Sequence, residues 1–181
     1  QQQLHPTTAP FHDVCFVVEE QRVPAHRNVL YARSAYFRAM LSDGFRESDS
    51  PEIHIQGTSC AAFKALLAYL YSDRMEVDED ELLLFDLAKL CDQYQEERLY
   101  NHCMWQLMKG ITHQNAVTRL IEAHACEGGG MWRKLLQGTT MAYVTRNLRA
   151  IWGEAKPTLA HLDTNRPDLY KKVVLDAALR L

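Results

Sequence analysis

Pairs of cysteine and histidine are the residues here that could form a catalytic nucleophile, because a thiolate beside a histidine base attacks carbonyl carbons. Neighbouring pairs in the sequence are Cys60 with His54, Cys103 with His102, and Cys126 with His124. A nucleophile needs its base close in space, and adjacent helical side chains point about 100° apart. We therefore expect packed thiols, no catalytic residue and no enzyme.

Metal and phosphate chemistry is not favoured by the spacing either. No two cysteines or histidines fall at i, i+4 on one helix with a third ligand nearby. The run Gly128-Gly129-Gly130 is not followed by Lys-Ser or Lys-Thr, as a phosphate-binding loop requires. The acidic run 78–81 indicates a helix start, because negative charge suits the positive end of the helix dipole. The sequence predicts no metal and no cofactor.

Residues 13–41 contain two strand patterns followed by a helical pattern. The segment 14–18 is apolar on both faces, which predicts a strand buried on both sides. Val23-Pro24-Ala25 predicts a shorter strand, and Pro24 places it at an edge or an end of the sheet. Apolar residues from Val29 to Leu41 recur mostly at spacings of three and four, which predicts a helix with one buried stripe.

Further patterns extend this mixture of strands and helices. Glu52-Ile53-His54-Ile55 alternates like a short strand, and Thr58 or Ser59 can cap the helix that follows and ends near 71–73. Two more helices are expected over 82–94 and 96–108, the second stopped by Gly110. The rest is helical in pattern, interrupted at 128–130 and punctuated by Pro157 and Pro167, with a last helix from Asp168.

Composition bounds the class of protein. The chain has 181 residues and is 47% hydrophobic, which suffices for a packed core in one large or two small domains. A net charge of -3 gives no general attraction to nucleic acid. There is no apolar run of membrane-spanning length. Five cysteines without C-x-x-C spacing favour reduced thiols, so we expect a cytoplasmic or nuclear protein that binds neither nucleic acid nor membrane.

The first half of the chain resembles a BTB/POZ domain. This likeness consists of many short matches in the right order, none of them specific alone. They are Asp13, Ala25-His26, Leu30-x-Ala32-Arg33-Ser34-x-Tyr36-Phe37-x-x-Met40-Leu41, Phe45-Arg46-Glu47-Ser48, Glu52-Ile53-His54-Ile55, Phe63-x-x-Leu66-x-x-Tyr69-Leu70-Tyr71, Leu84-x-x-Leu87-Ala88 and Tyr94. The resemblance implies an α+β fold, a short-stranded sheet flanked by clustered helices.

The second half is similar to a BACK domain, the helical module that often follows a BTB domain. The matching residues are Asn115-Ala116-x-x-x-Leu120-Ile121-x-Ala123, Tyr143-Val144-x-x-Asn147 and Pro167-x-Leu169, while the glycine run departs from the pattern. We predict a loose tail over 1–10, a BTB/POZ domain over 11–108 and an all-helical BACK module over 109–181.

BTB proteins that recruit cullin-3 carry a hydrophobic-x-Glu motif in one loop, and Phe45-Arg46-Glu47 looks like it. An exposed aromatic ring can enter a partner's groove while the carboxylate pairs with a base or caps a helix. The alternative is that Phe45 folds back onto its own domain. The resemblance implies further contacts to the N-terminal domain of cullin-3 at Tyr71, Asp73, His113 and Gln114, although Tyr71 could instead belong to the core.

The resemblance also implies a homodimer and a structural pair. The dimer face would be drawn from the first helical segment, or the same residues would pack in the core: Leu30, Tyr31, Ser34, Ala35, Phe37 and Arg38. Many dimeric relatives have an extra helix before the first strand, which residues 1–10 do not predict. Asp13 and His26 are expected to be buried polar residues, each bonded to the other or to the backbone.

The function implied is that of a non-enzymatic adaptor. The chain would homodimerise, bind cullin-3 and position a protein substrate of unknown identity for ubiquitin transfer. No substrate-reading module such as a Kelch propeller or MATH domain is visible. The alternative is a BTB scaffold for transcriptional or cytoskeletal complexes that does not bind cullin, in which Phe45 is buried or Glu47 is paired within the chain.

Overall fold

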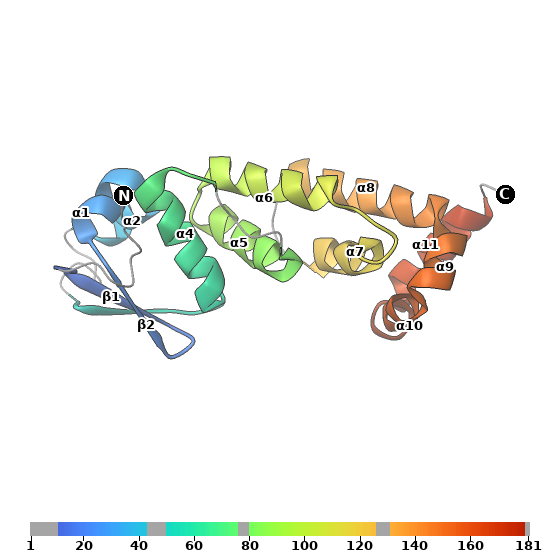
Figure 1. Cartoon of the computed structure of the whole chain (residues 1–181), viewed down its shortest axis with the longest axis horizontal. Helices are drawn as coiled ribbons and strands as arrows, with labels where there is room; N and C mark the ends of the chain where they lie inside the picture. The colour runs from blue at the N-terminus through green and yellow to red at the C-terminus, as the bar shows by residue number, and fades with distance from the viewer. Residues whose placement is uncertain (1–10, 43–49, 76–79, 126–130, 180–181) are drawn as a thin grey trace. The chain divides into compact units, whose positions relative to one another are not determined.

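The computed structural model describes residues 11–42, 50–75, 80–125 and 131–179, without the side chains of 131 and 132. The predicted tail 1–10, the Phe45-Arg46-Glu47 triplet, the acidic residues 78 and 79 and the glycine run lie outside these ranges. The chain divides into two compact units, Gln1–Cys103 and Met104–Leu181, which are shown in Figure 1 and described separately below.

Within the described residues, the sheet of the first unit has three short strands in the order β2-β1-β3. The central strand β1 (Val14–Val18) pairs antiparallel with β2 (Gln21–Ala25) and parallel with β3 (Glu52–Ile55). Four of its five residues are buried, which confirms the prediction of a strand covered on both faces. Strand β2 is an edge strand, as Pro24 predicted, because proline cannot donate to a neighbouring strand.

The helical segment that follows β2 differs from the prediction. Instead of one helix there are two, α1 (Arg27–Arg33) and α2 (Ala35–Met40), joined at Ser34. Ser34 is extended, with φ -128° and ψ 128°, so it ends one helix and begins the next. Its backbone N–H donates to the Leu30 carbonyl at 3.0 Å, and its carbonyl accepts from Arg38 at 2.9 Å. The break satisfies these backbone groups and turns Phe37 into the core, where it is fully buried.

Three longer helices were predicted to within about two residues. They are α4 (Cys60–Ser72), α5 (Glu81–Gln93) and α6 (Glu97–Lys109). Ser59 caps α4 by accepting from the Ala62 N–H at 3.3 Å, and Asp80 caps α5 by accepting from the Leu83 N–H at 3.0 Å. These caps fix where the helices begin, because the first backbone donors have no partner inside the helix.

Aromatic rings form the centre of the first unit. Phe16 of β1 lies 5.6 Å from Phe37 and 5.0 Å from Phe63 of α4, measured between ring centroids. Tyr36 stacks on Tyr94 at 3.9 Å, and Phe37 meets Tyr94 edge-on. These contacts hold α2, α4 and the end of α5 against the sheet.

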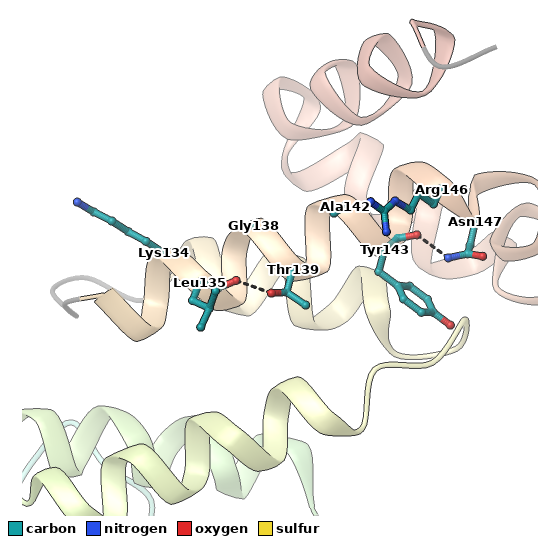
Figure 2. A pocket seen from close by; sticks show the side chains of 8 residues that line it. All are labelled: Lys134, Leu135, Gly138, Thr139, Ala142, Tyr143, Arg146 and Asn147. Atoms are coloured by element: carbon teal, nitrogen blue, oxygen red, sulfur yellow. Dashed lines mark hydrogen bonds between the residues drawn. The ribbon is translucent and has the colours of Figure 1, made fainter.

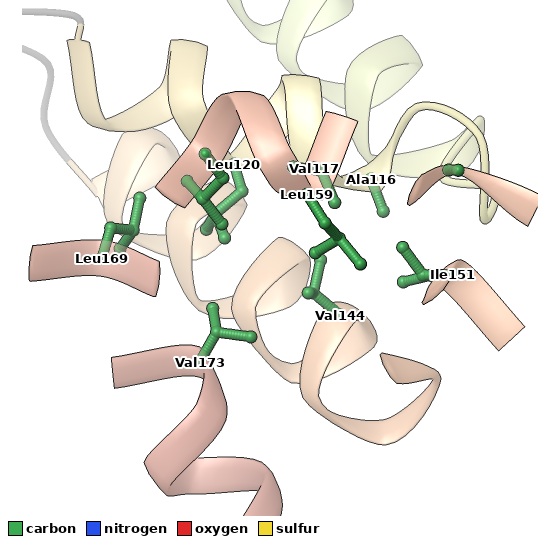
Figure 3. Packing of buried hydrophobic residues seen from close by; sticks show 10 residues of the cluster. Ala116, Val117, Leu120, Val144, Ile151, Leu159, Leu169 and Val173 are labelled. Atoms are coloured by element: carbon green, nitrogen blue, oxygen red, sulfur yellow. The ribbon is translucent and has the colours of Figure 1, made fainter. Parts of the chain in front are cut away.

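The second unit is all helical, as predicted. Its helices are α7 (Ala116–Ala125), α8 (Met131–Arg146), α9 (Leu148–Glu154), α10 (Lys156–Asn165) and α11 (Pro167–Ala178). Figure 3 shows their aliphatic side chains converging on one core, which includes Leu120, Val144, Ile151 and Val173. Helix α10 was not predicted. Pro157 was expected to interrupt the chain, but it lies in the first turn of α10, where the missing N–H needs no partner.

A buried arginine of α7 packs against the end of α6. Arg119 of α7 is 4% exposed, and its guanidinium donates to the Leu107 carbonyl near the end of α6. A Cβ atom at Gly110 would lie 3.0 Å from this guanidinium. Gly110 does follow the end of α6, as predicted, and its lack of a side chain leaves room for the arginine that covers this helix end.

Candidate protein-interaction surfaces

The predicted cullin-binding triplet belongs to the connection between α2 and β3. Phe45 and Glu47 lie outside the described residues, so their role stays a prediction. The residues that border this segment are hydrogen-bonded. Ser42 donates from Oγ to a carbonyl of α2 at 2.5 Å, and the carbonyl of Ser50 accepts from the Arg27 guanidinium.

Asp73 lies exposed at the carboxyl end of α4, where it is the hub of an ion-pair cluster. Its Oδ1 accepts from Arg33 of α1 at 2.6 Å and from Arg98 of α6 at 3.4 Å. Arg33 also donates from Nε to the Leu70 carbonyl at 3.0 Å. The Arg33 hydrogen bond is the main reason that the pKa of Asp73 is lowered. The carboxylate is therefore ionised and oriented at neutral pH, with both arginines beside it.

Tyr71, which is predicted to bind cullin-3, also makes a structural contact within the chain, to His26. Its hydroxyl accepts from the backbone N–H of His26 at 2.9 Å and lies 2.8 Å from the Nδ1 atom of the same residue. Burial raises the pKa of Tyr71, partly offset by that backbone hydrogen bond. The phenol thus ties the carboxyl end of α4 to the start of α1.

Asp13 and His26 were expected to be buried, and this part of the prediction is wrong. Asp13 is exposed, and its Oδ1 accepts from the Arg27 N–H at 2.7 Å, in the first turn of α1. His26 is half-buried beside Tyr71. Water still solvates a helix-capping carboxylate at the surface, so Asp13 does not pay the full cost of burying a charge and does not need a buried partner. Its bond to a backbone group agrees with the prediction.

The six residues predicted for a dimer face divide into two groups. Tyr31, Ala35 and Arg38 are exposed. Leu30, Ser34 and Phe37 are buried within their own unit, at 0%, 1% and 0% exposure, which agrees with the alternative that these residues pack in the core. The reason is the break at Ser34, which points the apolar side of both short helices inward.

The exposed group has a defined shape because Arg38 folds onto Tyr31. The guanidinium carbon lies 5.7 Å from the centre of the tyrosine ring. Its Nε donates to the Tyr31 carbonyl at 3.0 Å, and a terminal nitrogen donates to the Ala32 carbonyl at 3.3 Å. The arginine caps the carboxyl end of α1 and covers one ring face, an arrangement that stabilises both side chains.

His113 and Gln114 lie at the rim of a pocket in the second unit. The pocket has a volume of about 410 Å³ and also includes Tyr143 and Glu154. His113 Nδ1 lies 3.2 Å from Glu154 Oε2, and its ring centre lies 5.8 Å from that of Tyr143. The structure thus adds Glu154, at the end of α9, to the two residues predicted. No sequence signal could have found it, since 41 positions separate it from His113.

Two of the four cysteines of the first unit, Cys91 and Cys103, have thiols that burial makes poor nucleophiles. Cys15, Cys60, Cys91 and Cys103 are all buried and free. Burial is the main reason that the pKa of Cys91 is raised, and it raises the pKa of Cys103 to about 12. A thiol with such a pKa is almost entirely protonated at neutral pH, and the thiolate is the reactive form. Cys126 lies outside the described residues.

Within the described residues, no group of three or more His, Cys, Asp or Glu side chains could hold a metal ion. Over the same ranges, no helix is both long and apolar enough to cross a membrane.

The sequence model of the BTB/POZ domain matches residues 2–110. The chain belongs to the BTB/POZ domain family. The small mixed sheet with its clustered helices is therefore a BTB/POZ fold, and an all-helical region follows it. BTB/POZ domains are protein-interaction domains that are typically not catalytic.

Curated relatives share this part of the chain. BTB/POZ domain-containing protein 9 of Homo sapiens is 48% identical over 86 residues, which cover 46% of this chain and 14% of that protein. Kelch-like protein 36 of Rattus norvegicus is 37% identical over 109 residues, covering 55% and 17% respectively. Kelch-like protein 38 of Danio rerio is 30% identical over 119 residues, covering 65% and 20%.

The matched segments thus span no more than a fifth of each of these longer relatives. Among solved structures, the BTB domain of human Gigaxonin matches at 25% sequence identity with a TM-score of 0.43. That match covers 51% of this chain and 75% of the other.

Proposed function

We propose that this chain is part of a substrate-adaptor subunit of a cullin-3 RING ubiquitin ligase. The observation that supports this most is the BTB/POZ match together with the triplet Phe45-Arg46-Glu47, which follows α2 and precedes β3 in the sequence. The triplet has the hydrophobic-x-Glu pattern of BTB proteins that recruit cullin-3. A BTB/POZ domain supplies a non-catalytic binding surface, as such an adaptor needs.

The ion-pair cluster at Asp73 supports a second part of the binding surface. Asp73 is exposed, ionised and held by ion pairs with Arg33 and Arg98. These charges therefore keep a fixed arrangement at the surface, where they do not incur the desolvation cost of a buried ion pair. Fixed polar groups bind with a smaller loss of side-chain entropy than mobile ones. Tyr71, two residues earlier, is less available because its hydroxyl already accepts a hydrogen bond from the His26 backbone N–H.

We also infer that the helical region after about residue 109 is a BACK domain. It follows the BTB/POZ domain directly, and its residues Ala116, Leu120 and Val144 form part of one buried core, as the matching pattern requires. In this proposal the pocket of His113 and Gln114 extends the surface that binds cullin-3. Its polar rim suits hydrogen bonds to a peptide segment.

The adaptor would act as a homodimer. Of the predicted dimer residues, Tyr31, Ala35 and Arg38 remain accessible and lie on α1 and α2. The structure favours a contact through the Tyr31 ring and the Arg38 guanidinium, which are enriched at protein interfaces. The other three predicted residues would support this face from the core.

Calorimetric titration with the N-terminal domain of cullin-3 tests the binding proposal. Phe45→Ala and Glu47→Lys should each weaken binding by about 2 kcal/mol or more, roughly thirtyfold, because central anchors dominate interface energy. Phe11→Ala and Glu20→Lys are matched controls at exposed positions that do not belong to the triplet and should bind like the parent chain. Binding by none of the five proteins would favour a BTB scaffold that does not bind cullin, and equal binding by all five would show that Phe45 and Glu47 are not the anchors.

Sedimentation velocity tests the dimer separately. Tyr31→Ala combined with Arg38→Glu should shift the chain towards monomer without loss of folding. Lys171→Glu combined with Lys172→Glu lies in the second unit and serves as a charge control. A chain that is monomeric before any substitution would remove homodimerisation from the proposal.

A further inference from the structure

A groove of about 500 Å³ runs along one face of helix α8 (Figure 2). The residues that line it belong to this helix, from Lys134 to Arg146, together with Asn147, which directly follows the helix. They recur as adjacent pairs every four positions, which places them in one lengthwise stripe. The twelve helical steps from Lys134 to Arg146 span about 18 Å at 1.5 Å per residue. The groove is therefore long enough to contact several turns of another helix.

The middle of the groove is shallow because small residues line it. Polar side chains that line the groove, Thr139 and Asn147, donate hydrogen bonds to backbone carbonyls of α8. A Cβ atom at Gly138 would meet nothing within 4 Å, and Ala142 lies one turn further along. Thr139 donates to the Leu135 carbonyl at 2.8 Å, and Asn147 donates to the carbonyl four residues before it at 2.9 Å. Leu135 is 46% exposed. Glycine is unfavourable inside a helix, and here no described neighbour needs the space that it leaves.

Positive charge stands at both ends of the groove. Lys134 and Arg146 are exposed, and among the described residues neither is paired with a carboxylate. The sequence from 131 to 153 contains four basic residues and no Asp or Glu. In the whole chain, by contrast, acidic residues outnumber basic ones by 23 to 20. This local excess favours an anionic partner over a cationic or neutral one.

We propose that this face of α8 binds an acidic amphipathic helix of another polypeptide. Its carboxylates would pair with Lys134 and Arg146, and its small apolar side chains would lie over Gly138, where the two backbones can approach closely. A lipid surface or a nucleic acid would use the two cations but would not need the open space at Gly138. This binding site is separate from the Phe45-Arg46-Glu47 triplet and does not require cullin-3.

Fluorescence anisotropy with the full chain tests this proposal. The probe is a labelled helical peptide of about 16 residues, with Leu and Ala along one face and Glu in the first and last turns. It should bind saturably, and more weakly as salt rises from about 0.05 M to about 0.5 M. Lys134→Glu combined with Arg146→Glu should weaken binding by about tenfold or more.

The second variant, Gly138→Leu, fills the groove without changing charge. Leucine is a better helix former than glycine, so α8 stays folded, and binding should weaken by about tenfold because the close approach is blocked. Lys171→Glu combined with Lys172→Glu makes the same charge change on α11 and should leave affinity unchanged. Far-UV circular dichroism verifies that each variant is folded.

Three results would overturn the proposal. They are no saturable binding of the acidic peptide, equal binding of a peptide in which Lys replaces every Glu, and unchanged affinity in the α8 variants. Vesicles that contain phosphatidylserine provide the competing test. Lipid binding that depends on Lys134 and Arg146 but is indifferent to Gly138→Leu, without peptide binding, would assign this face to a membrane surface instead.

Discussion

The two units of this protein build their cores from different side chains. In the BTB/POZ unit, Phe16, Phe37, Phe63 and Tyr94 meet in one aromatic cluster, although 78 positions separate the first from the last. The buried core cluster of the helical unit consists only of Ala, Val, Leu and Ile, with tyrosines packed at its margin. A few large rings thus connect remote elements in the first unit, whereas many small contacts hold the second together.

Two helices of the BTB/POZ unit and three of the helical unit also differ in how they begin. Helices α4 and α5 begin with side-chain caps from Ser59 and Asp80. Helices α9, α10 and α11 begin without such a cap. The starts of α4 and α5 are therefore set by local caps and reinforced by the core. Those of α9, α10 and α11, like those of the short helices α1 and α2, have no such cap from their own N-cap residue and depend more on packing. This contrast predicts where single substitutions act most strongly.

The largest effect is expected for Phe37→Ala. Removing this fully buried ring should destabilise the BTB/POZ unit by about 3–5 kcal/mol, because it contacts four other aromatic side chains and leaves a cavity. Urea unfolding followed by tyrosine fluorescence measures the loss. Tyr31→Ala, on the exposed side of the neighbouring helix, is the control. A well-folded Phe37→Ala protein that has only lost self-association would return Phe37 to the dimer face.

Leu120→Ala should have a smaller effect, about 2–4 kcal/mol, and it should act on the helical unit. Its neighbours are aliphatic and come from several helices, so the surrounding chain can relax into part of the cavity. Hydrogen exchange measured by mass spectrometry should show faster exchange in α7, α8 and α10. Equal acceleration throughout α4 and α5 would mean that the two units unfold as one, which contradicts the comparison.

Ser59→Ala should cost about 1 kcal/mol, because the Ala62 N–H loses its acceptor. Asn147→Ala, at the start of α9, is the matched substitution at a helix start without a side-chain cap. Thermal unfolding of the two variants compares them directly. The contrast between the units fails if Asn147→Ala destabilises its helix as much as Ser59→Ala does.

The smallest effect concerns the ion pairs of Asp73. Its pKa is lower in the folded state than the ordinary value of 3.8, so ionisation stabilises the fold above that value and is lost as pH falls through the lower, folded pKa. Asp73→Asn should therefore be slightly less stable than the parent at pH 7 and equal to it in strong acid. The difference should shrink with salt, because the pairs are exposed. A difference that grows towards low pH would contradict this assignment.

Local patterns predicted much of the fold. The apolar run 14–18, the alternation at 52–55 and the periodic segments of α4, α5 and α6 gave the strands and helices almost to the residue. Ser59 was one of two predicted caps, and Pro24 predicted an edge strand. These signals are strong because side-chain period and capping chemistry act within a few residues.

The errors arise where packing overrides a local signal. Apolar spacing continues across Ser34, so it predicted one helix, and only the three-dimensional core shows two helices with Leu30 and Phe37 turned inward. Proline at 157 reads as a break, yet α10 forms because Leu159 and Leu162 are buried in the helical core. The pairing of His113 with Glu154 could not be predicted, since no rule relates side chains that far apart in the chain.

By itself, the sequence determined the segments of β1, β3, α4, α5 and α6, where several of them begin, and to which family the first unit belongs. These properties depend on residue type and short spacing. The tertiary structure alone decided which apolar residues of α1 and α2 are buried, which arginines hold Asp73, and which face of α8 is left open. Burial and ion pairing depend on distances between residues remote in the chain, and only the packed fold fixes those distances.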